Sequence, residues 1–350
     1  MKLRKKLYFW GGIGLILLIL SAVFSLSIGS AKLSLNEVWG ILVKQIPLLG
    51  DFVENSWKAS AEQIILKVRL PRIILALLVG ASLSIAGAGF QGVLRNPLAD
   101  PYTLGVASGA SVGAAFVILF GLQTVLLGIW TIPIAAFLTG LISLLVVLRL
   151  ANIQGQYNLE TLILSGVVVS AFLSSFVSFM VSMSDKVINE IVFWMMGSLS
   201  LQGWEFIQIL LPSFFIAFIA LIAYSRSLNI FALGERQAAH LGLNVKRTRL
   251  LILIVSTFIT AVAVSIVGTV GFVGLVVPHL IRLLVGPDYR ILIPLSAIYG
   301  GVFVLWADTI ARTLLSPTEI PLGVVTAFLG APFFAYLLRK NKQTKVGGSL

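Results

Sequence analysis

The side chains best suited to chemistry gather in one polar segment, Ser227 to Arg249, between two long apolar runs. Glu235 stands where the first turn of a short helix is expected, and a negative charge there complements the helix dipole. Gly242 follows the apolar Leu241 as a C-terminal cap. A short helix with an apolar face, held between two membrane spans, is suited to docking a soluble partner. A solvated basic loop that only fixes the topology is the alternative. The other ionisable side chains of the segment are Arg236, His240, Lys246, Arg247 and Arg249.

The sequence offers little support for metal, nucleophilic or redox chemistry. The chain has no cysteine, which excludes disulfides, thiolate metal sites and cysteine nucleophiles. His240 and His279 have no companions of the kind that a metal site or a membrane-embedded enzyme would need. We therefore predict no catalytic residue, no cofactor and no metal site.

Two further groups of polar side chains lie within apolar runs. Asp308 is expected to pair with Arg312, one helical turn on, because an unpaired charge at mid-bilayer costs about 2.5–3.5 kcal/mol. A structural pair is favoured over a proton relay. Six serines either line a polar path or satisfy carbonyls within helices. They are Ser165, Ser170, Ser174, Ser175, Ser178 and Ser182.

Composition fixes the class of protein that must position these side chains. The 350 residues are 58% hydrophobic and 11% charged, with a mean hydropathy of +1.04. These values predict an all-α polytopic membrane protein, since the apolar runs are continuous rather than alternating as in a β-barrel. The net charge of +12 is explained by basic cytoplasmic loops and does not require nucleic acid.

About ten transmembrane helices are expected in one domain, 1–350. Most of the Lys and Arg residues then lie inside, so both termini are predicted to be cytoplasmic. Residues 31–68 form an extracytoplasmic loop with room for one interfacial helix, and 227–249 lies in the cytoplasm. The spans are Leu7–Ile28, Ile73–Leu94, a third one from Gly105, Trp130–Leu148, Thr161–Met183, Phe206–Tyr224, Leu250–Val270, a short eighth one ending at Val285, Ile291–Ile310 and Leu322–Leu338.

Small residues recur at every fourth position in the second and third spans. Such stripes let helix backbones approach closely within lipid, so both spans are expected inside the bundle. The stripes are Gly80, Ser84, Ala88 and Gly92, then Gly105, Gly109 and Gly113. GFQG at 89–92 and GFVG at 271–274 lie on spans of opposite direction, which indicates two pseudo-symmetric inverted halves.

Taken together, several stretches resemble the permease subunits of ABC importers for iron–siderophore complexes, haem and cobalamin. They run in the family order and cover nearly the whole chain. The stretches are RLPRIILALLVGASLSIAGAGFQGVLRNPLADPYTLGVASGA (69–110), FWMMGSL (193–199), LGERQAAHLGLN (233–244), GTVGFVGLVVPHLIRLLVGPDYR (268–290), ADTIAR (307–312) and 319–324.

The resemblance implies partners and site residues. A second permease subunit, two ATP-binding subunits below and an extracytoplasmic substrate-binding protein above would complete an importer in the cell membrane. The chain has no phosphate-binding glycine loop of its own, so it is not expected to be an enzyme. Residues 227–249 would be a coupling loop that contacts the ATP-binding subunit through Gly234, Glu235, Arg236, Ala238, Leu241 and Gly242. Arg69 and Arg312 would meet acidic residues of the binding protein, and Asn158, Leu159 and Glu160 would form a cytoplasmic gate.

The same resemblance favours an iron(III)–siderophore complex as the substrate, with cobalamin or haem as alternatives. An ion-coupled secondary carrier is the rival from another class. It would need intramembrane acids, of which Asp308 is the only clear candidate in the sequence.

Overall fold

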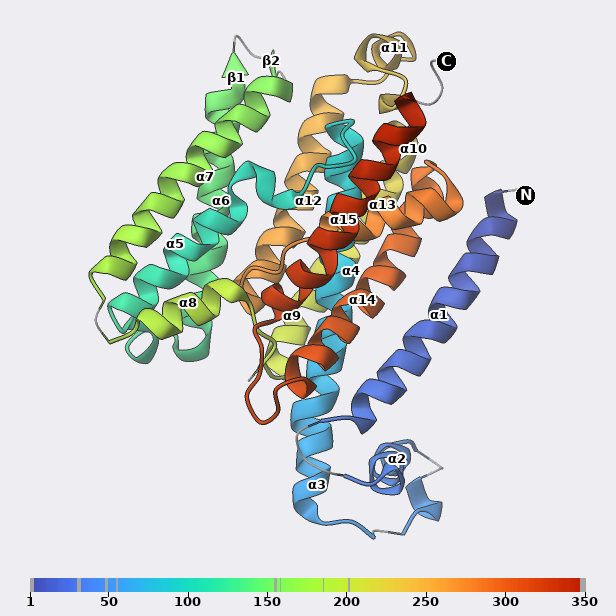
Figure 1. Ribbon diagram of the computed structural model, residues 1–350, viewed down its shortest axis with the longest axis vertical. Helices are drawn as coiled ribbons and strands as arrows, with labels where there is room; N and C mark the ends of the chain where they lie inside the picture. Colours follow the sequence, from blue (N-terminus) through green and yellow to red (C-terminus); the bar gives the residue numbers. More distant parts are fainter. Residues whose placement is uncertain are drawn as a thin grey trace.

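The computed structural model describes most of the chain. The described residues are 3–29, 33–47, 50–54, 56–153, 156–157, 159–184, 186–200 and 202–346. Within them the protein is almost wholly helical (Figure 1). The α-helices are α1 (Leu3–Ser27), α2 (Leu35–Lys44), α3 (Ala59–Gln63), α4 (Leu70–Val93), α5 (Val106–Leu119), α6 (Thr131–Ala151), α7 (Leu159–Ser182), α8 (Ile188–Met196), α9 (Trp204–Ala223), α10 (Ser225–Phe231), α11 (Glu235–His240), α12 (Val245–Val267), α13 (Val273–Val285), α14 (Tyr289–Thr313) and α15 (Leu322–Val346).

Shorter elements connect these helices. The π-helix η2 (Ile64–Arg69) joins α3 to α4, and 3-10 turns occur at Gly50–Phe52, Pro101–Leu104, Leu122–Thr124 and Gly128–Trp130. The strands β1 (Asn152–Ile153) and β2 (Gln156–Tyr157) form an antiparallel hairpin. The sequence predicted no strands there, because two-residue strands leave no alternating pattern to read.

The helices divide by length into two groups. In the described part of the chain, seven stretches are long and apolar enough to cross a membrane. Val106–Leu119, Val273–Val285 and Leu322–Tyr336 are apolar but shorter. Each of the ten predicted spans coincides with one of these helices, so the predicted helical membrane fold is confirmed. A helix of 14 residues rises only about 21 Å, so the number of full spans stays a prediction.

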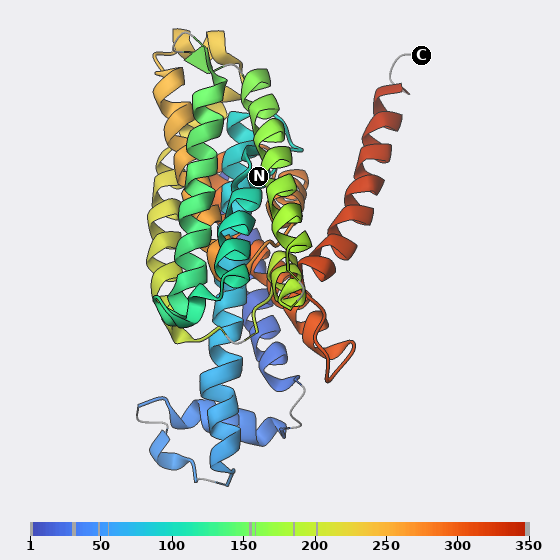
Figure 2. The same cartoon turned by 90° about the vertical axis from the view of Figure 1, so that its left-hand side faces the viewer.

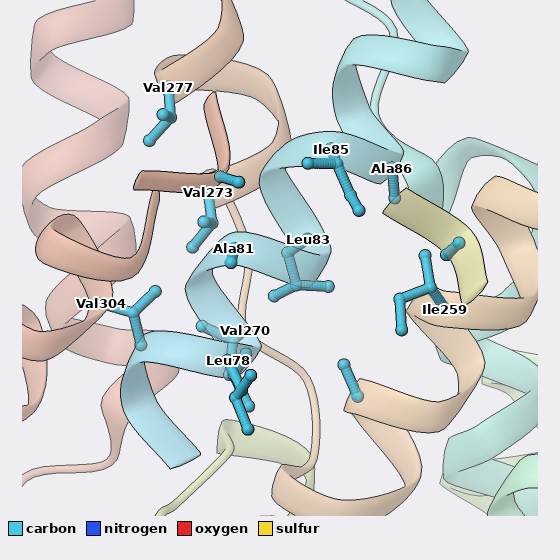
Figure 3. Packing of buried hydrophobic residues seen from close by; sticks show 14 of the residues in the cluster. Leu78, Ala81, Leu83, Ile85, Ala86, Ile259, Val270, Val273, Val277 and Val304 are labelled. Carbon is cyan, nitrogen blue, oxygen red and sulfur yellow. The ribbon is translucent and has the colours of Figure 1, made fainter. Parts of the chain in front are cut away.

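The centre of the bundle is α4. In the most apolar 18-residue stretch of its helix, 89% of the residues are buried, against 28% in the corresponding stretches of α1 and α7. It packs against α14, α12, α13 and α9. Figure 3 shows labelled side chains of α4, among them Ala81 and Leu83, among those of α12, α13 and α14, and Val273 lies beside Ala81 in this view. Burial on nearly every side of α4 agrees with a sequence that is apolar all round.

Small residues stand where the backbones approach most closely. A Cβ atom at Gly80 would overlap the carbonyl oxygen of Gly300 on α14. A Cβ at Gly109 would lie 2.7 Å from the carbonyl oxygen of Thr139 on α6. Side chains larger than hydrogen therefore cannot enter these two helix contacts without moving a backbone.

The two ends of the bundle differ. The helix α11 lies at one end, toward which the two chain termini also point, whereas α2 and α3 lie at the opposite end (Figure 1). The segment from Ala59 to Val93 runs as one helical rod of 35 residues, or about 50 Å, which exceeds the hydrocarbon thickness of a bilayer. The helix α15 inclines away from the rest of the bundle (Figure 2).

Candidate functional site

Glycines set the backbone shape of the predicted coupling loop, 227–249. Gly234 (φ +105°) precedes α11 and Gly242 (φ +80°) follows it, and both backbone conformations favour glycine. The side chain of Asn244 then caps α12 by accepting a hydrogen bond from the backbone N–H of Arg247 at 3.0 Å. Two glycines and one cap therefore define where the short helix begins and where the next span starts.

The outer face of the coupling loop is apolar at two points and basic between them. Leu233 and Leu241 are 60% and 63% exposed. Arg236 and His240 are also exposed, while Ala238 is fully buried and packs toward the bundle. Leu241 and Arg236 are therefore available to a partner, whereas Ala238 holds the helix in place.

Glu235 anchors the coupling loop to the bundle. Its carboxylate forms an ion pair with the guanidinium of the buried Arg249 on α12, and it lies 4.0 Å from that of Arg95 in the α4–α5 turn. Glu235 thus ties α11 to α12 and to the α4–α5 turn. The sequence marked Arg249 only as one basic residue among several, because a contact across a turn leaves no periodic signal.

A second group of charges, Arg72, Asp308 and Glu319, lies at the opposite end of the bundle. We call it the outer charge cluster, because this end is expected to face outside. The Arg72 guanidinium donates to Asp308 at 2.8 and 3.0 Å and to Glu319 at 2.9 and 3.0 Å. Asp308 is 1% exposed, so its charge requires this compensation. Ser200 also donates to Glu319. Burial acts to raise the pKa of Glu319, but hydrogen bonds from Arg72 and Ser200 outweigh it and leave that pKa lowered.

The predicted ion pair between Asp308 and Arg312 is confirmed, and Asp308 has a second, closer partner. Arg312 does form an ion pair with it, but at 3.6 Å, and the closer bidentate partner is Arg72. Arg72 is 236 residues away in the chain, and spacing along one helix cannot reveal such a partner. The bidentate geometry makes the interhelical pair the stronger of the two.

The two arginines predicted to dock a binding protein are both buried. Arg69 is 5% exposed and donates to the carbonyl oxygen of Leu26 at 2.8 Å. Arg312 is 6% exposed and donates to the carbonyl oxygen of Ile28 at 2.6 Å. Both guanidinium groups therefore hold the C-terminal end of α1 in this conformation, and their role in docking stays a prediction.

The predicted gate is only partly visible. Asn158 lies outside the described residues. Leu159 is half-buried and Glu160 is exposed, and together they form the first turn of α7 after the β1–β2 hairpin. Their role as a gate stays a prediction.

A hydroxyl-lined groove of about 560 Å³ lies between α5, α7, α8 and the α12–α13 connection. Ser108 and Ser174 approach each other across it at 3.3 Å between their Oγ atoms. Of the serines of the fifth predicted span, Ser174 and Ser178 line this groove. The lining bears hydroxyls and apolar side chains without a charged group, and is formed by Tyr102, Ala107, Ser108, Ser111, Ser174, Val177, Ser178, Val181, Val192, Met195, Thr269 and Gly271.

The histidines do not form a site in the described part of the chain. His240 is exposed at the end of α11, and His279 is 7% exposed on α13 with its ring 6.1 Å from that of Phe334. No group of three or more His, Asp or Glu side chains among the described residues could hold a metal ion.

A helical bundle with an exposed polar loop at one end and an uncharged groove within it has the form of a transport subunit. The model of the FecCD transport family matches residues 17–340. The chain belongs to this family. The FecCD match spans both the coupling loop and the outer charge cluster, so the family resemblance read from the sequence is confirmed.

Relatives and a solved structure support the FecCD assignment. The chain is 45% identical to a cobalamin import system permease protein of Halobacterium salinarum, over 81% of this chain and 75% of the relative. It is 36% identical to the Fe(3+) dicitrate permease protein FecD of Escherichia coli, over 84% and 91%. A solved metal-chelate type ABC transporter, in an inward-facing conformation, matches with a TM-score of 0.80 and 33% identity over 96% of this chain and 99% of that one. The FecCD chain is thus a membrane permease of the ABC importer type, a class that works with ATP-binding and substrate-binding proteins.

Proposed function

We propose that this permease carries an iron(III)–siderophore complex into the cytoplasm as part of an ATP-driven importer. The observation that carries the proposal is the coupling loop, whose exposed Leu233 and Leu241 form a docking surface on a chain without a phosphate-binding glycine loop. A second copy of the chain or a similar permease, two ATP-binding subunits and an extracytoplasmic binding protein complete the assembly.

The roles of the site residues follow from their positions. Leu241 and Arg236 contact an ATP-binding subunit, while Gly234, Glu235, Ala238 and Gly242 fix the shape and seat of α11. Arg69 and Arg312 exchange their carbonyl partners for carboxylates of the binding protein when it docks, since guanidinium groups bind carboxylates in a bidentate way. Leu159 and Glu160, at the start of α7, contribute to the cytoplasmic gate.

The substrate class is supported by the groove. Hydroxyls and apolar side chains without a net charge suit a bulky chelate whose metal is already fully coordinated. Such a lining gives weak contacts, and a transport path must release what it receives. Cobalamin is the second candidate, and the specific observation in its favour is the 45% identity to a cobalamin permease.

The first experiment is gentle extraction from the native membrane, followed by identification of co-purifying subunits and an ATPase assay. Reconstituted vesicles are then offered ⁵⁵Fe(III)–hydroxamate siderophore, ⁵⁷Co-cobalamin and haemin. We expect a stoichiometric ATP-binding subunit and ATP-dependent uptake of the iron chelate. Preferred uptake of cobalamin would replace the substrate and keep the importer.

A matched pair of variants locates the docking surface. Leu241→Ser removes an exposed apolar side chain from the coupling loop, and Phe52→Ser removes one that is 86% exposed at the other end of the molecule. We expect only Leu241→Ser to release the ATP-binding subunit. A chain that purifies alone and transports on an ion gradient would refute the importer proposal and direct attention to Asp308.

A further inference from the structure

The α4–α13 contact contains a carbonyl that its own helix cannot satisfy. Pro278 lies inside α13 and has no N–H, so the carbonyl oxygen of Gly274, four residues earlier, loses its helical donor. The amide Nε2 of Gln91 on α4 donates to this oxygen at 3.2 Å and to the carbonyl oxygen of Leu275 at 3.2 Å. Gln91 is 2% exposed, so it replaces the missing bond within the interior of the protein.

The side-chain carbonyl of Gln91 is also hydrogen-bonded. Its Oε1 atom accepts a hydrogen bond from Arg282 at 2.9 Å. Arg282 also donates a hydrogen bond to the hydroxyl of Tyr289 at 3.3 Å. The carbon of its guanidinium lies 5.9 Å from the centroid of the Tyr289 ring. Gln91 therefore connects the first turn of α13 with the first turn of α14.

Asn229 connects α14 with the beginning of the coupling loop. On α10, its Nδ2 donates to Asp288 at 2.8 Å and its Oδ1 accepts from the backbone N–H of Tyr289 at 2.9 Å. An amide that uses both ends fixes its orientation as well as its distance. Hydrogen bonds from Arg290 and Asn229, with the charge of Arg290, lower the pKa of Asp288 to about 2, so it is ionised near neutral pH.

These contacts form one continuous series, which we call the amide relay: Asn229, Asp288, Tyr289, Arg282, Gln91 and the Gly274 carbonyl. Its far end adjoins residues 268–274, of which Thr269 and Gly271 line the hydroxyl-lined groove. This stretch is not helical before Val273, and Phe272 has a φ of +66°. A non-helical stretch beside the groove can shift at lower cost than a continuous helix, because it has fewer internal hydrogen bonds to break.

We propose that Asn229 and Gln91 are positioning residues that transmit displacement of the coupling loop to residues 268–274 and so change the shape of the hydroxyl-lined groove. The proposal rests on the proposed function, because it requires an ATP-binding subunit on the coupling loop. Neither residue is assigned contact with the substrate. Their action is mechanical, through hydrogen bonds that join α10, α14, α13 and α4.

The test uses the intact complex, trapped with ATP and orthovanadate or left free of nucleotide. The measured quantity is amide hydrogen exchange in residues 268–274. In the unaltered complex we expect trapping to change their exchange rate by about fivefold or more, the range of ordinary allosteric coupling. Asn229→Ala and Gln91→Met should abolish this response while the complex still assembles and hydrolyses ATP.

Matched controls lie on the same two helices. Ser227→Ala alters α10, and Ser82→Ala removes a fully buried hydroxyl from α4, in both cases outside the amide relay. Both should respond as the unaltered complex does. The double variant should be no worse than the more affected single one, because two links of one series are non-additive. Gln91→Glu keeps the acceptor for Arg282 and loses the donor for the carbonyl oxygen of Gly274. It replaces Gln91→Met in the test if the complex with the Met variant does not assemble.

Three outcomes would overturn the relay. They are no exchange response in the unaltered complex, an unchanged response in Asn229→Ala and Gln91→Glu, or an equal loss in both serine controls. Failure of the proposed function is a separate result, because no ATP-binding subunit would then co-purify.

Discussion

At the scale of single residues, charge is balanced across helices rather than along them. Arg72 connects a buried aspartate on α14 with a glutamate in the α14–α15 connection. Spacing identified Asp308 as a charge that needs a partner, but only the fold brings Arg72 to it. The orphan carbonyl of Gly274 could have been read from Pro278 four residues on, yet its donor Gln91 is 183 residues away. The sequence can show that a buried group needs a partner, but it seldom shows which residue supplies that partner.

Removing one member of the buried pair should be more harmful than removing both. Arg72→Met removes the closer partner of the buried Asp308 and leaves only the longer ion pair with Arg312, and breaking a buried pair costs about 3–5 kcal/mol. Arg72→Met with Asp308→Leu should recover most of this loss. Thermal unfolding of the purified complex measures both, with Arg226→Met as a control that removes an exposed arginine. If the double variant were as unstable as the sum of its single changes, the two side chains would not be coupled.

At the scale of helices, hydropathy located the lipid-embedded part of an element and missed its continuation. The second span was predicted from Ile73, whereas the helical rod begins at Ala59 and passes through a π-helical segment. The eighth span was predicted as a short apolar segment, and α13 has 13 residues. The length of an apolar run indicates the thickness of the lipid layer that a helix crosses. The helix itself can extend beyond that layer wherever its backbone hydrogen bonds are satisfied.

A methyl group at the contact between Gly80 and Gly300 should separate α4 from α14. Gly80→Ala places a Cβ against the carbonyl oxygen of Gly300, and overpacking of this kind costs about 1–3 kcal/mol. Gly12→Ala is the matched control, since a Cβ there meets no atom within 4 Å. The melting temperature of the complex should fall for Gly80→Ala only. Equal melting temperatures for the two variants would show that the contact can relax.

At the scale of the whole molecule, the two ends have different chemistry. The end with α11 presents exposed apolar and basic side chains, and the opposite end carries α2, α3 and the outer charge cluster. Basic loops favour the cytoplasm, so the coupling-loop end is expected inside. The sequence supports this orientation through the distribution of Lys and Arg alone.

The absence of native cysteine makes the orientation directly testable. Single-cysteine variants Phe52→Cys and Ala239→Cys place one exposed thiol at each end of the molecule. A membrane-impermeant maleimide added to spheroplasts should label Phe52→Cys at once and Ala239→Cys only after permeabilisation. The reverse labelling pattern would show that the protein has the opposite orientation in the membrane, with the coupling loop outside.

The π-helical segment Ile64–Arg69 has a consequence for the outer end of the molecule. The Trp204 indole donates to the carbonyl oxygen of Leu66 within it, at 2.9 Å. A π turn holds more residues than an α turn, and each residue of an α-helix advances the direction of the side chains by about 100°. Gain or loss of one residue here would therefore leave the rod intact and rotate α3, with Trp57 and α2, to a new azimuth. The direction that these segments face is thus a matter of helical phase, set in the six-residue π-helical segment that directly precedes α4.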